Sequence, residues 1–130
     1  MIDFRRAVEA RDPDAIAATL AEDVVFRSPV AFKPYPGKAL TAAILRGVLR
    51  VFEDFRYVRE LSGDGGREHA LLFEARIGGV AVEGCDFVHL DGKGLIDEFT
   101  VMVRPLSAAQ ALAAAMAEEF ERIQREAAAG

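Results

Sequence analysis

The fold is decided by residues 80–103, which read VAVEGCDFVHL (80–90), DGKG (91–94) and LIDEFTVMV (95–103). Two long runs of alternating apolar and polar residues, joined by a glycine-rich turn, are typical of a β-hairpin. Because strand side chains alternate between two faces, every second residue of the first run shares a face with Asp86. These neighbours are all apolar or glycine: Val80, Val82, Gly84, Val88 and Leu90. Asp86 is therefore an ionisable group in the middle of an apolar face.

The turn determines how the two strands pair. A two-residue loop at Gly92-Lys93 places Asp86 opposite Phe99, and a loop shifted back by one residue places it opposite Asp97. Both pairings put the odd-numbered residues of the second strand on the Asp86 face, namely Phe99, Val101 and Val103. A three-residue loop or a bulge would exchange the two faces.

The rest of the chain predicts helices, one short strand and two further long strands. Apolar residues at helical spacing predict helices at residues 2–11, 12–20 and 38–52 and a C-terminal helix at about 107–127. Asp12 and Pro13 are typical of a helix start, and Ser107 is the expected cap of the last helix. Alternation predicts strands at 24–26, 55–61 and 68–77. This order favours one α+β domain over residues 1–130, in which three N-terminal helices lie against a curved, mainly antiparallel sheet.

Charge and composition narrow the class of function. A net charge of −5 and a pI near 5.1 argue against a nucleic-acid partner. No apolar run approaches the ~20 residues that span a bilayer, so no membrane partner is expected. His69, His89 and Cys85 lack metal-ligand spacing, and we expect neither a metal nor another cofactor. A single cysteine, with no signal peptide at the start, favours the cytoplasm.

Several stretches resemble the nuclear-transport-factor-2-like superfamily and, within it, the SnoaL-like branch. They are AEDVVFRSP (21–29), PYPGKAL (34–40) and VEGCDFVHLDGKGLIDEFTVMVRP (82–105), together with the opening helix pair. The resemblance covers nearly the whole chain. It implies a cone-shaped domain, a curved sheet around one deep pocket, and a homodimer formed through the outer face of the sheet.

The resemblance also allows enzymatic branches of the superfamily to be compared residue by residue. Relative to the ketosteroid isomerase pattern, Ser28 falls at the general base, Phe4 at the tyrosine and Asp86 at the hairpin acid. Serine without a base cannot take a proton from carbon and phenylalanine cannot donate to an oxyanion, so steroid isomerisation is not expected. The aspartate, arginine, aspartate relay of the epoxide hydrolases would need Asp86 and Asp97 on one face, but Arg104 lies on the other. Cyclases need one carboxyl in an apolar pocket, which Asp86 alone could supply.

Asp86 is the predicted catalytic residue, because burial among apolar side chains raises a carboxyl pKa and makes a hydrogen-bond donor or general acid. The alternative is a structural carboxyl held by a tyrosine, histidine or arginine. Turnover would need a second polar group from Tyr35, Tyr57 or His69. The predicted ligand pocket consists of Phe26, Tyr35, Tyr57, Phe73, Val88, Phe99 and Val101.

The sequence therefore predicts that a small hydrophobic molecule binds in an enclosed apolar pocket. A metal-free isomerase, cyclase or dehydratase would use Asp86 as its acid. The alternative is a non-catalytic dimeric module that binds a ligand or another protein. The sequence assigns no substrate and does not decide whether a reaction is catalysed.

Overall fold

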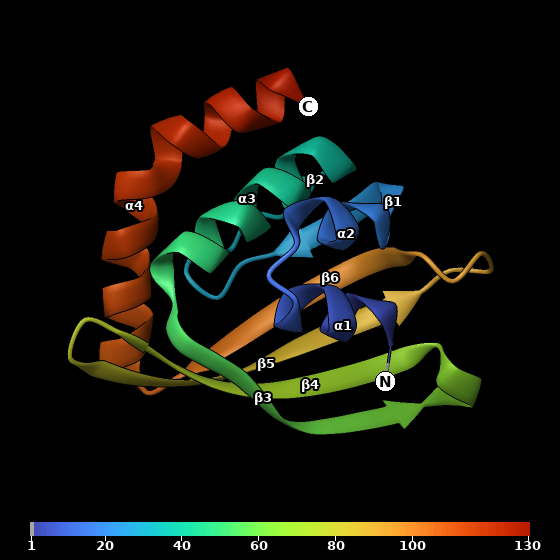
Figure 1. Ribbon diagram of the computed structural model, residues 1–130, viewed down its shortest axis with the longest axis horizontal. Coiled ribbons are helices and arrows are strands. Elements are labelled where there is room, and N and C mark those ends of the chain that lie inside the picture. Colours follow the sequence, from blue (N-terminus) through green and yellow to red (C-terminus); the bar gives the residue numbers. More distant parts are fainter. Residues whose placement is uncertain (1) are drawn as a thin grey trace.

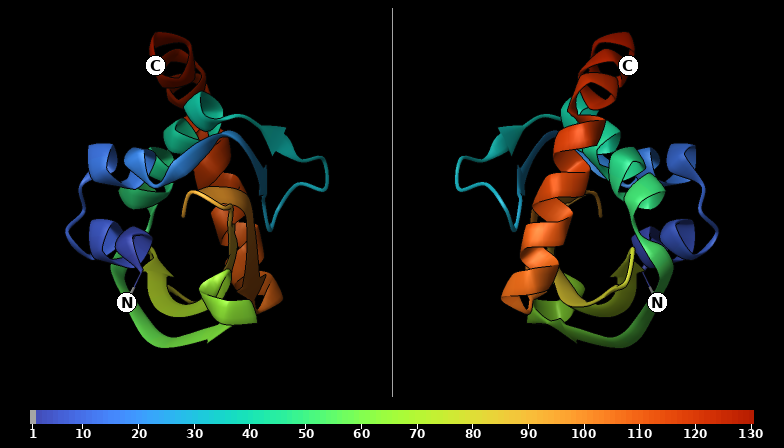
Figure 2. Two further views of the ribbon diagram at one scale, coloured as in Figure 1. Left: turned by 90° about the vertical axis from the view of Figure 1, so that its right-hand side faces the viewer. Right: turned by 90° about the vertical axis from the view of Figure 1, so that its left-hand side faces the viewer.

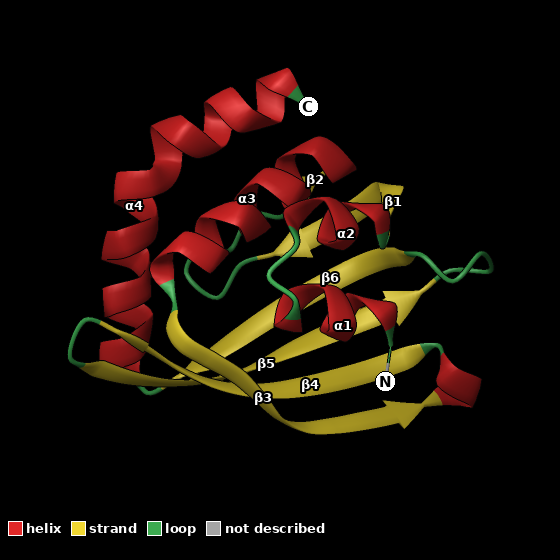
Figure 3. Cartoon of the chain, in the orientation of Figure 1, coloured by secondary structure: helices red, strands yellow, loops and turns green. Residues whose placement is uncertain are grey.

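A six-stranded sheet curves around the N-terminal helices in the computed structural model, which describes residues 2–130 (Figures 1 and 3). The helices are α1 (Asp3–Glu9), α2 (Pro13–Ala18), α3 (Lys38–Val51) and α4 (Leu106–Ala129), with one 3-10 turn, η1 (Asp64–Gly66). The strands are β1 (Leu20–Arg27), β2 (Tyr35–Pro36), β3 (Glu53–Gly63), β4 (Glu68–Ile77), β5 (Val80–Leu90) and β6 (Ile96–Arg104). The predicted α+β class and helix order are confirmed.

The strands lie in the order β2-β1-β6-β5-β4-β3, and β1 pairs with β6 in parallel while the other pairs are antiparallel. Viewed end on, the sheet is strongly bent and the helices α1, α2 and α3 lie on its concave side (Figure 2). The concave face of the sheet and the inner faces of α1, α2 and α3 supply the core. The N-terminal half of α4 runs beside the sheet, and its C-terminal half passes over α3 (Figure 1).

The boundary between α2 and β1 differs from the prediction. The Asp12 carboxylate accepts hydrogen bonds from the amides of Asp14 and Ala15, as expected for a helix cap. Leu20, predicted on the buried face of this helix, instead begins β1. The amide of Ile96 donates to the carbonyl of Thr19, so pairing with β6 ends the helix at Ala18, two residues before Leu20. Local helical spacing was overridden by a strand that lies far away in the sequence.

In the hairpin between β5 and β6 the side chains lie on the predicted faces, but the loop and the pairing differ from the prediction. The loop contains five residues, 91–95, and a bulge lies between His89 and Leu90. An odd loop exchanges the faces of the second strand and the bulge exchanges them back. Asp86 therefore lies opposite Val101, not opposite Phe99 or Asp97, but Phe99 and Val101 still share its face.

The C-terminal helix also differs at both ends. It begins at Leu106 after Pro105, and Ser107 lies inside the first turn without capping it, because Pro105 holds the cap position. The helix continues to Ala129. Ion pairs from Arg50 to Glu119 (2.6 Å) and Glu126 (2.9 Å) bind its second half to α3, which explains why the helix remains regular there. None of the helices in residues 2–130 is long and apolar enough to cross a membrane.

Gly84 provides a test of the packing. It lies opposite Phe73 in the neighbouring strand, and a Cβ atom at residue 84 would overlap the Phe73 ring. We expect Gly84→Ala to lower the free energy of unfolding by about 1–3 kcal/mol, because the ring must leave a well-packed position. Urea denaturation would measure the change.

Gly63 is the matched control, because it also lies in a strand but has no atom within 4 Å of an added Cβ. Gly63→Ala should leave the stability within about 0.5 kcal/mol of the wild type. Equal effects of the two substitutions would contradict the packing role of Gly84.

Candidate ligand-binding site

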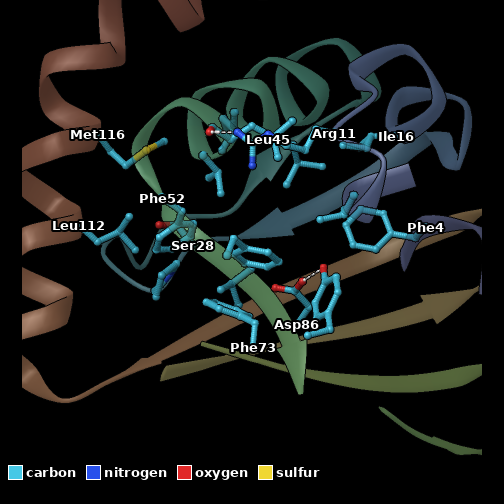
Figure 4. A pocket seen from close by; sticks show the side chains of 18 of the residues that line it. Phe4, Arg11, Ile16, Ser28, Leu45, Phe52, Phe73, Asp86, Leu112 and Met116 are labelled. Atoms are coloured by element: carbon cyan, nitrogen blue, oxygen red, sulfur yellow. Dashed lines mark hydrogen bonds between the residues drawn. The ribbon is translucent and has the colours of Figure 1, made fainter. Parts of the chain in front are cut away.

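An apolar cavity lies between the concave face of the sheet, the end of β1 and the helices α1, α3 and α4 (Figure 4). Its free volume is about 70 Å³. One water needs roughly 10–15 Å³ by this measure, so the cavity holds about five water-sized groups. The apolar lining residues are Phe4, Val8, Ile16, Pro29, Val30, Ile44, Leu45, Val48, Leu49, Phe52, Phe55, Phe73, Val101, Leu112 and Met116. The polar side chains of the lining come from Arg11, Ser28, Tyr57 and Asp86.

Asp86 and Tyr57 form a buried hydrogen-bonded pair at the floor of this cavity. The Tyr57 hydroxyl donates to Oδ2 of Asp86 over 2.7 Å. Asp86 comes from β5 and Tyr57 from β3, so the contact bridges the intervening strand β4. The two residues are only 6% and 8% exposed.

The surroundings of the pair alter both pKa values. Burial raises the pKa of Asp86 from 3.8 to about 7, although the hydrogen bond from Tyr57 lowers it. Burial, followed by the negative charge of Asp86, raises the pKa of Tyr57 well above its ordinary value. Tyr57 is therefore a neutral donor near neutral pH, while Asp86 is present in both its acid and its carboxylate form.

The second carboxyl oxygen of Asp86 is directed toward the cavity (Figure 4). Within residues 2–130 the only side-chain donor to Asp86 is Tyr57, which contacts Oδ2. As long as Tyr57 donates to Oδ2, the proton of the acid form of Asp86 lies on Oδ1. The acid form thus presents a donor to any ligand in the cavity, and the carboxylate presents an acceptor.

Arg5 supports the tyrosine from outside the cavity. The guanidinium carbon of Arg5 lies 5.7 Å from the centre of the Tyr57 ring, and its Nη1 is 3.1 Å from a carboxylate oxygen of Glu60. On the other side, the Phe55 ring meets Tyr57 edge to face at 5.0 Å. These contacts fix the direction of the Tyr57 hydroxyl.

Two further polar groups reach the cavity. Ser28 accepts a hydrogen bond from the amide of Val30 (3.1 Å), which leaves its hydroxyl proton free to donate. Arg11 donates from Nη2 to the carbonyl of Leu49 (2.8 Å). Arg11 was not among the predicted site residues. The predicted first helix extended to residue 11, but α1 ends at Glu9 and Arg11 lies in the turn before α2, so helical spacing did not indicate the direction of its side chain.

The predicted pocket residues fall into three groups. Asp86, Tyr57, Phe73 and Val101 line the cavity. Phe26 and Tyr35 line an adjoining hollow between β1, β2 and α4. Val88 and Phe99 lie in the packed core, where Phe4 of α1 covers Phe99 at 5.1 Å between ring centres, and neither lines the cavity.

Both histidines lie away from the cavity. His69 contacts the carbonyl of Gly66 through Nε2 (2.8 Å). His89 contacts Asp97 (2.6 Å) on the outer face of the sheet, so the expectation that Asp97 could share a face with Asp86 is wrong. The bulge beside His89 turns Asp97 outward.

In residues 2–130, one group of side chains has its ligand atoms close enough to hold a metal ion, with His89, Asp97 and Glu98 within 4.8 Å of one another. His89 and Asp97 already pair with each other, and Glu98 pairs with Arg27 (3.5 Å). These contacts account for the cluster without an ion.

A curved sheet that wraps around helices and an apolar cavity with a buried carboxyl defines a cone-shaped α+β domain. The profile of the SnoaL-like domain matches residues 2–99. The chain belongs to the SnoaL-like family, as its sequence motifs indicated.

Solved structures agree with this assignment. A steroid delta-isomerase from Pseudomonas aeruginosa is 40% identical, with a TM-score of 0.88 over 94% of this chain and 89% of that one. An uncharacterized protein with a cystatin-like fold from Silicibacter pomeroyi is 37% identical, with a TM-score of 0.84 over 90% and 82%. A putative polyketide cyclase from Pseudomonas putida shares the fold at 21% identity and a TM-score of 0.67, over 82% and 89%. No curated protein matches the sequence.

The raised pKa of Asp86 makes stability depend on pH. The folded protein binds this proton more tightly than the unfolded chain, so the stabilisation is complete below about pH 4 and is lost as the pH rises through 7. The shift corresponds to on the order of 4 kcal/mol. We expect Asp86→Asn to flatten the decline in unfolding free energy between pH 4 and pH 7, measured by urea denaturation at fixed pH values.

Asp23→Asn is the control, because Asp23 is an exposed carboxylate on β1. This variant should retain the wild-type decline. A decline that is equally steep in Asp86→Asn would show that Asp86 is not the group responsible.

Proposed function

We propose that the cavity binds a small apolar molecule with one carbonyl or enol oxygen, and that Asp86 and Tyr57 recognise this oxygen. The observation that carries the proposal is the second oxygen of the Asp86 carboxyl, which points into an apolar cavity while Tyr57 holds the first. An apolar ligand gains free energy from burial, and one polar group fixes its orientation.

The same pair supports acid–base chemistry without a metal. Protonated Asp86 can give its proton from Oδ1 to a ligand oxygen, and the resulting carboxylate can take a proton from a neighbouring carbon. In a dehydration, the first transfer releases the hydroxyl as water, and the second forms the carbon–carbon double bond and restores the acid. A pKa near 7 suits both directions of transfer at neutral pH.

The relatives help to choose the ligand class. One is a steroid delta-isomerase and another a putative polyketide cyclase, and both names indicate oxygenated carbon skeletons. In this chain Phe4 and Ser28 stand at the positions where the isomerase pattern has a tyrosine and a base. The cavity of about 70 Å³ is also far below the roughly 300 Å³ at which pockets for larger ligands begin. We therefore propose a ketone or enol whose reacting end is smaller than a steroid ring system.

A test uses small ketones such as cyclohexanone and follows thermal unfolding and binding between pH 5 and pH 9. Affinity should fall at least tenfold as the pH rises through about 7, because the ligand oxygen needs the proton of Asp86. Asn at residue 86 can still accept from Tyr57 and donate to the ketone, so Asp86→Asn should bind without this pH dependence. Asp86→Leu should lose binding. Ketone affinity that is independent of pH in the wild type would contradict the role of Asp86.

Turnover separates the enzyme from a module that only binds. In D₂O, an enolising enzyme replaces the protons beside the carbonyl with deuterium, and proton NMR records the loss of their signal. The wild type should accelerate this exchange and Asp86→Asn should not. Binding without exchange in the wild type would favour the non-catalytic module.

We also propose that the protein forms a homodimer through the outer face of the sheet. Large apolar side chains are exposed on this face: Val58, Leu61, Phe87 and Met102. Water contact with such a set is unfavourable, and a second copy could cover it.

We propose the cytoplasm as the location of the protein. Its single cysteine, Cys85, is compatible with a reducing compartment.

Met102 is 60% exposed, and Met102→Asp should turn the dimer into a monomer, because the interface would bury an unpaired charge from each copy. Sedimentation velocity at micromolar concentration would record the change. Leu106→Asp is the control, because Leu106 is 73% exposed but lies on α4. A wild type that sediments as a monomer would rule out the dimer.

A further inference from the structure

A second apolar hollow adjoins the cavity on the side away from Asp86. It lies between β1, β2, α3 and the C-terminal half of α4, and its volume is about 270 Å³. We call the cavity with Asp86 the inner chamber and this hollow the outer chamber. The outer chamber is lined by Phe26, Ser28, Val30, Tyr35, Leu40, Ile44, Met116, Phe120, Ile123 and Gln124.

The two chambers share part of their walls. Ser28, Val30, Ile44 and Met116 line both of them. These residues come from the loop after β1, from α3 and from α4, so they form the partition between the chambers, which we call the neck. Met116 is directed from α4 toward the inner chamber (Figure 4).

The neck can widen through a side chain rather than through a helix. Met116 has three rotatable bonds and no branch, and such a side chain changes shape at little cost. The helix itself is held, because Arg46 and Arg50 of α3 pair with Glu126 of α4 at 3.4 Å and 2.9 Å. Gly47 lies beneath this contact, where an added Cβ would come within 3.5 Å of the Met116 methyl group and 2.9 Å of Ile123.

The outer chamber is larger than the inner chamber, and its lining includes polar side chains. Its walls are mainly apolar, and Phe120 is 51% exposed at its edge. Tyr35 and Gln124 add a hydroxyl and an amide. The inner chamber alone holds about five water-sized groups, so a longer ligand needs further space, and the adjoining outer chamber offers it.

We infer that both chambers form one site for an elongated apolar molecule, whose carbonyl or enol oxygen contacts Asp86 while its apolar tail passes Met116 and fills the outer chamber. This inference rests on the proposed function, since it uses the oxygen contact at Asp86 to fix one end. It adds the substrate class, an oxygenated compound with a long unbranched or narrow tail.

The test measures the affinity of straight-chain methyl ketones from butan-2-one to dodecan-2-one. Each added methylene should improve affinity about fourfold beyond the length that fills the inner chamber, because the tail continues into apolar surroundings. Phe120→Asp and Gln124→Trp should weaken the long ketones at least tenfold and leave the short ketones unchanged, the first through charge and the second through volume. Leu106→Asp, on the same helix but outside both chambers, should change neither.

The outcomes separate the two proposals. Affinity that stops rising once the inner chamber is full, or equal losses for short and long ketones in Phe120→Asp, would overturn the shared site and leave the function of Asp86 intact. Long ketones that bind equally well to Asp86→Leu would support the outer chamber but contradict the role of Asp86. A series in which no member binds would contradict both.

Discussion

The hydrogen bond from Tyr57 to Asp86 connects two strands that are not neighbours, across the concave side of a strongly curved sheet. A carboxyl removed from water carries a large penalty unless it is paired or neutral. Here one donor satisfies one of its oxygens and burial keeps the group close to neutrality. The cavity exists next to this oxygen because the surrounding aromatic rings pack against one another and leave the carboxyl uncovered. Any repacking that closed the cavity would bury the second oxygen without a partner.

Aromatic rings and charged side chains have different roles around the Asp86–Tyr57 pair. The rings of Phe52, Phe55 and Phe73 lie within 5.7 Å of each other in pairs and form one rigid wall. Arg5 and Glu60 lie behind Tyr57 and keep its ring in place. Arg5 and Glu60 thus stay outside the cavity, where water still reaches them, while Arg11, which lines the cavity, donates to the carbonyl of Leu49. Burial keeps the pKa of Asp86 high, and within residues 2–130 the hydrogen bond from Tyr57 is the influence that opposes it.

Much of the fold could be predicted from the sequence, because alternation in β4, β5 and β6 and helical spacing in α3 are each long and regular. Short elements were harder. The two residues of β2 carry no periodicity, and the parallel pairing of β1 with β6 depends on contacts distant in the sequence. For the site, Asp86 stood out as the single charge on an apolar face. Its hydrogen-bond partner could not be selected among Tyr35, Tyr57 and His69, because the curvature of the sheet determines which of these side chains lies within reach of Asp86. Val88 and Phe99 also point inward, but α1 covers that end of the face, so an inward direction did not establish contact with the cavity.

The five-residue loop and the adjacent bulge between β5 and β6 have a consequence for how such a chain can change over evolutionary time. Each irregularity alone would turn Phe99 and Val101 away from the core, and only together do they leave the inner face intact. Loss of one residue is therefore tolerable if the loop shortens to four residues and the bulge stays, or if the bulge disappears and the loop keeps five residues. Gain of one residue is tolerable if the loop lengthens to six residues or if a second bulge forms. Since β5 is also paired with β4 along its whole length, Asp86 keeps its direction during such a change. Related chains can thus differ by one residue in this hairpin and still present the same carboxyl to the same cavity.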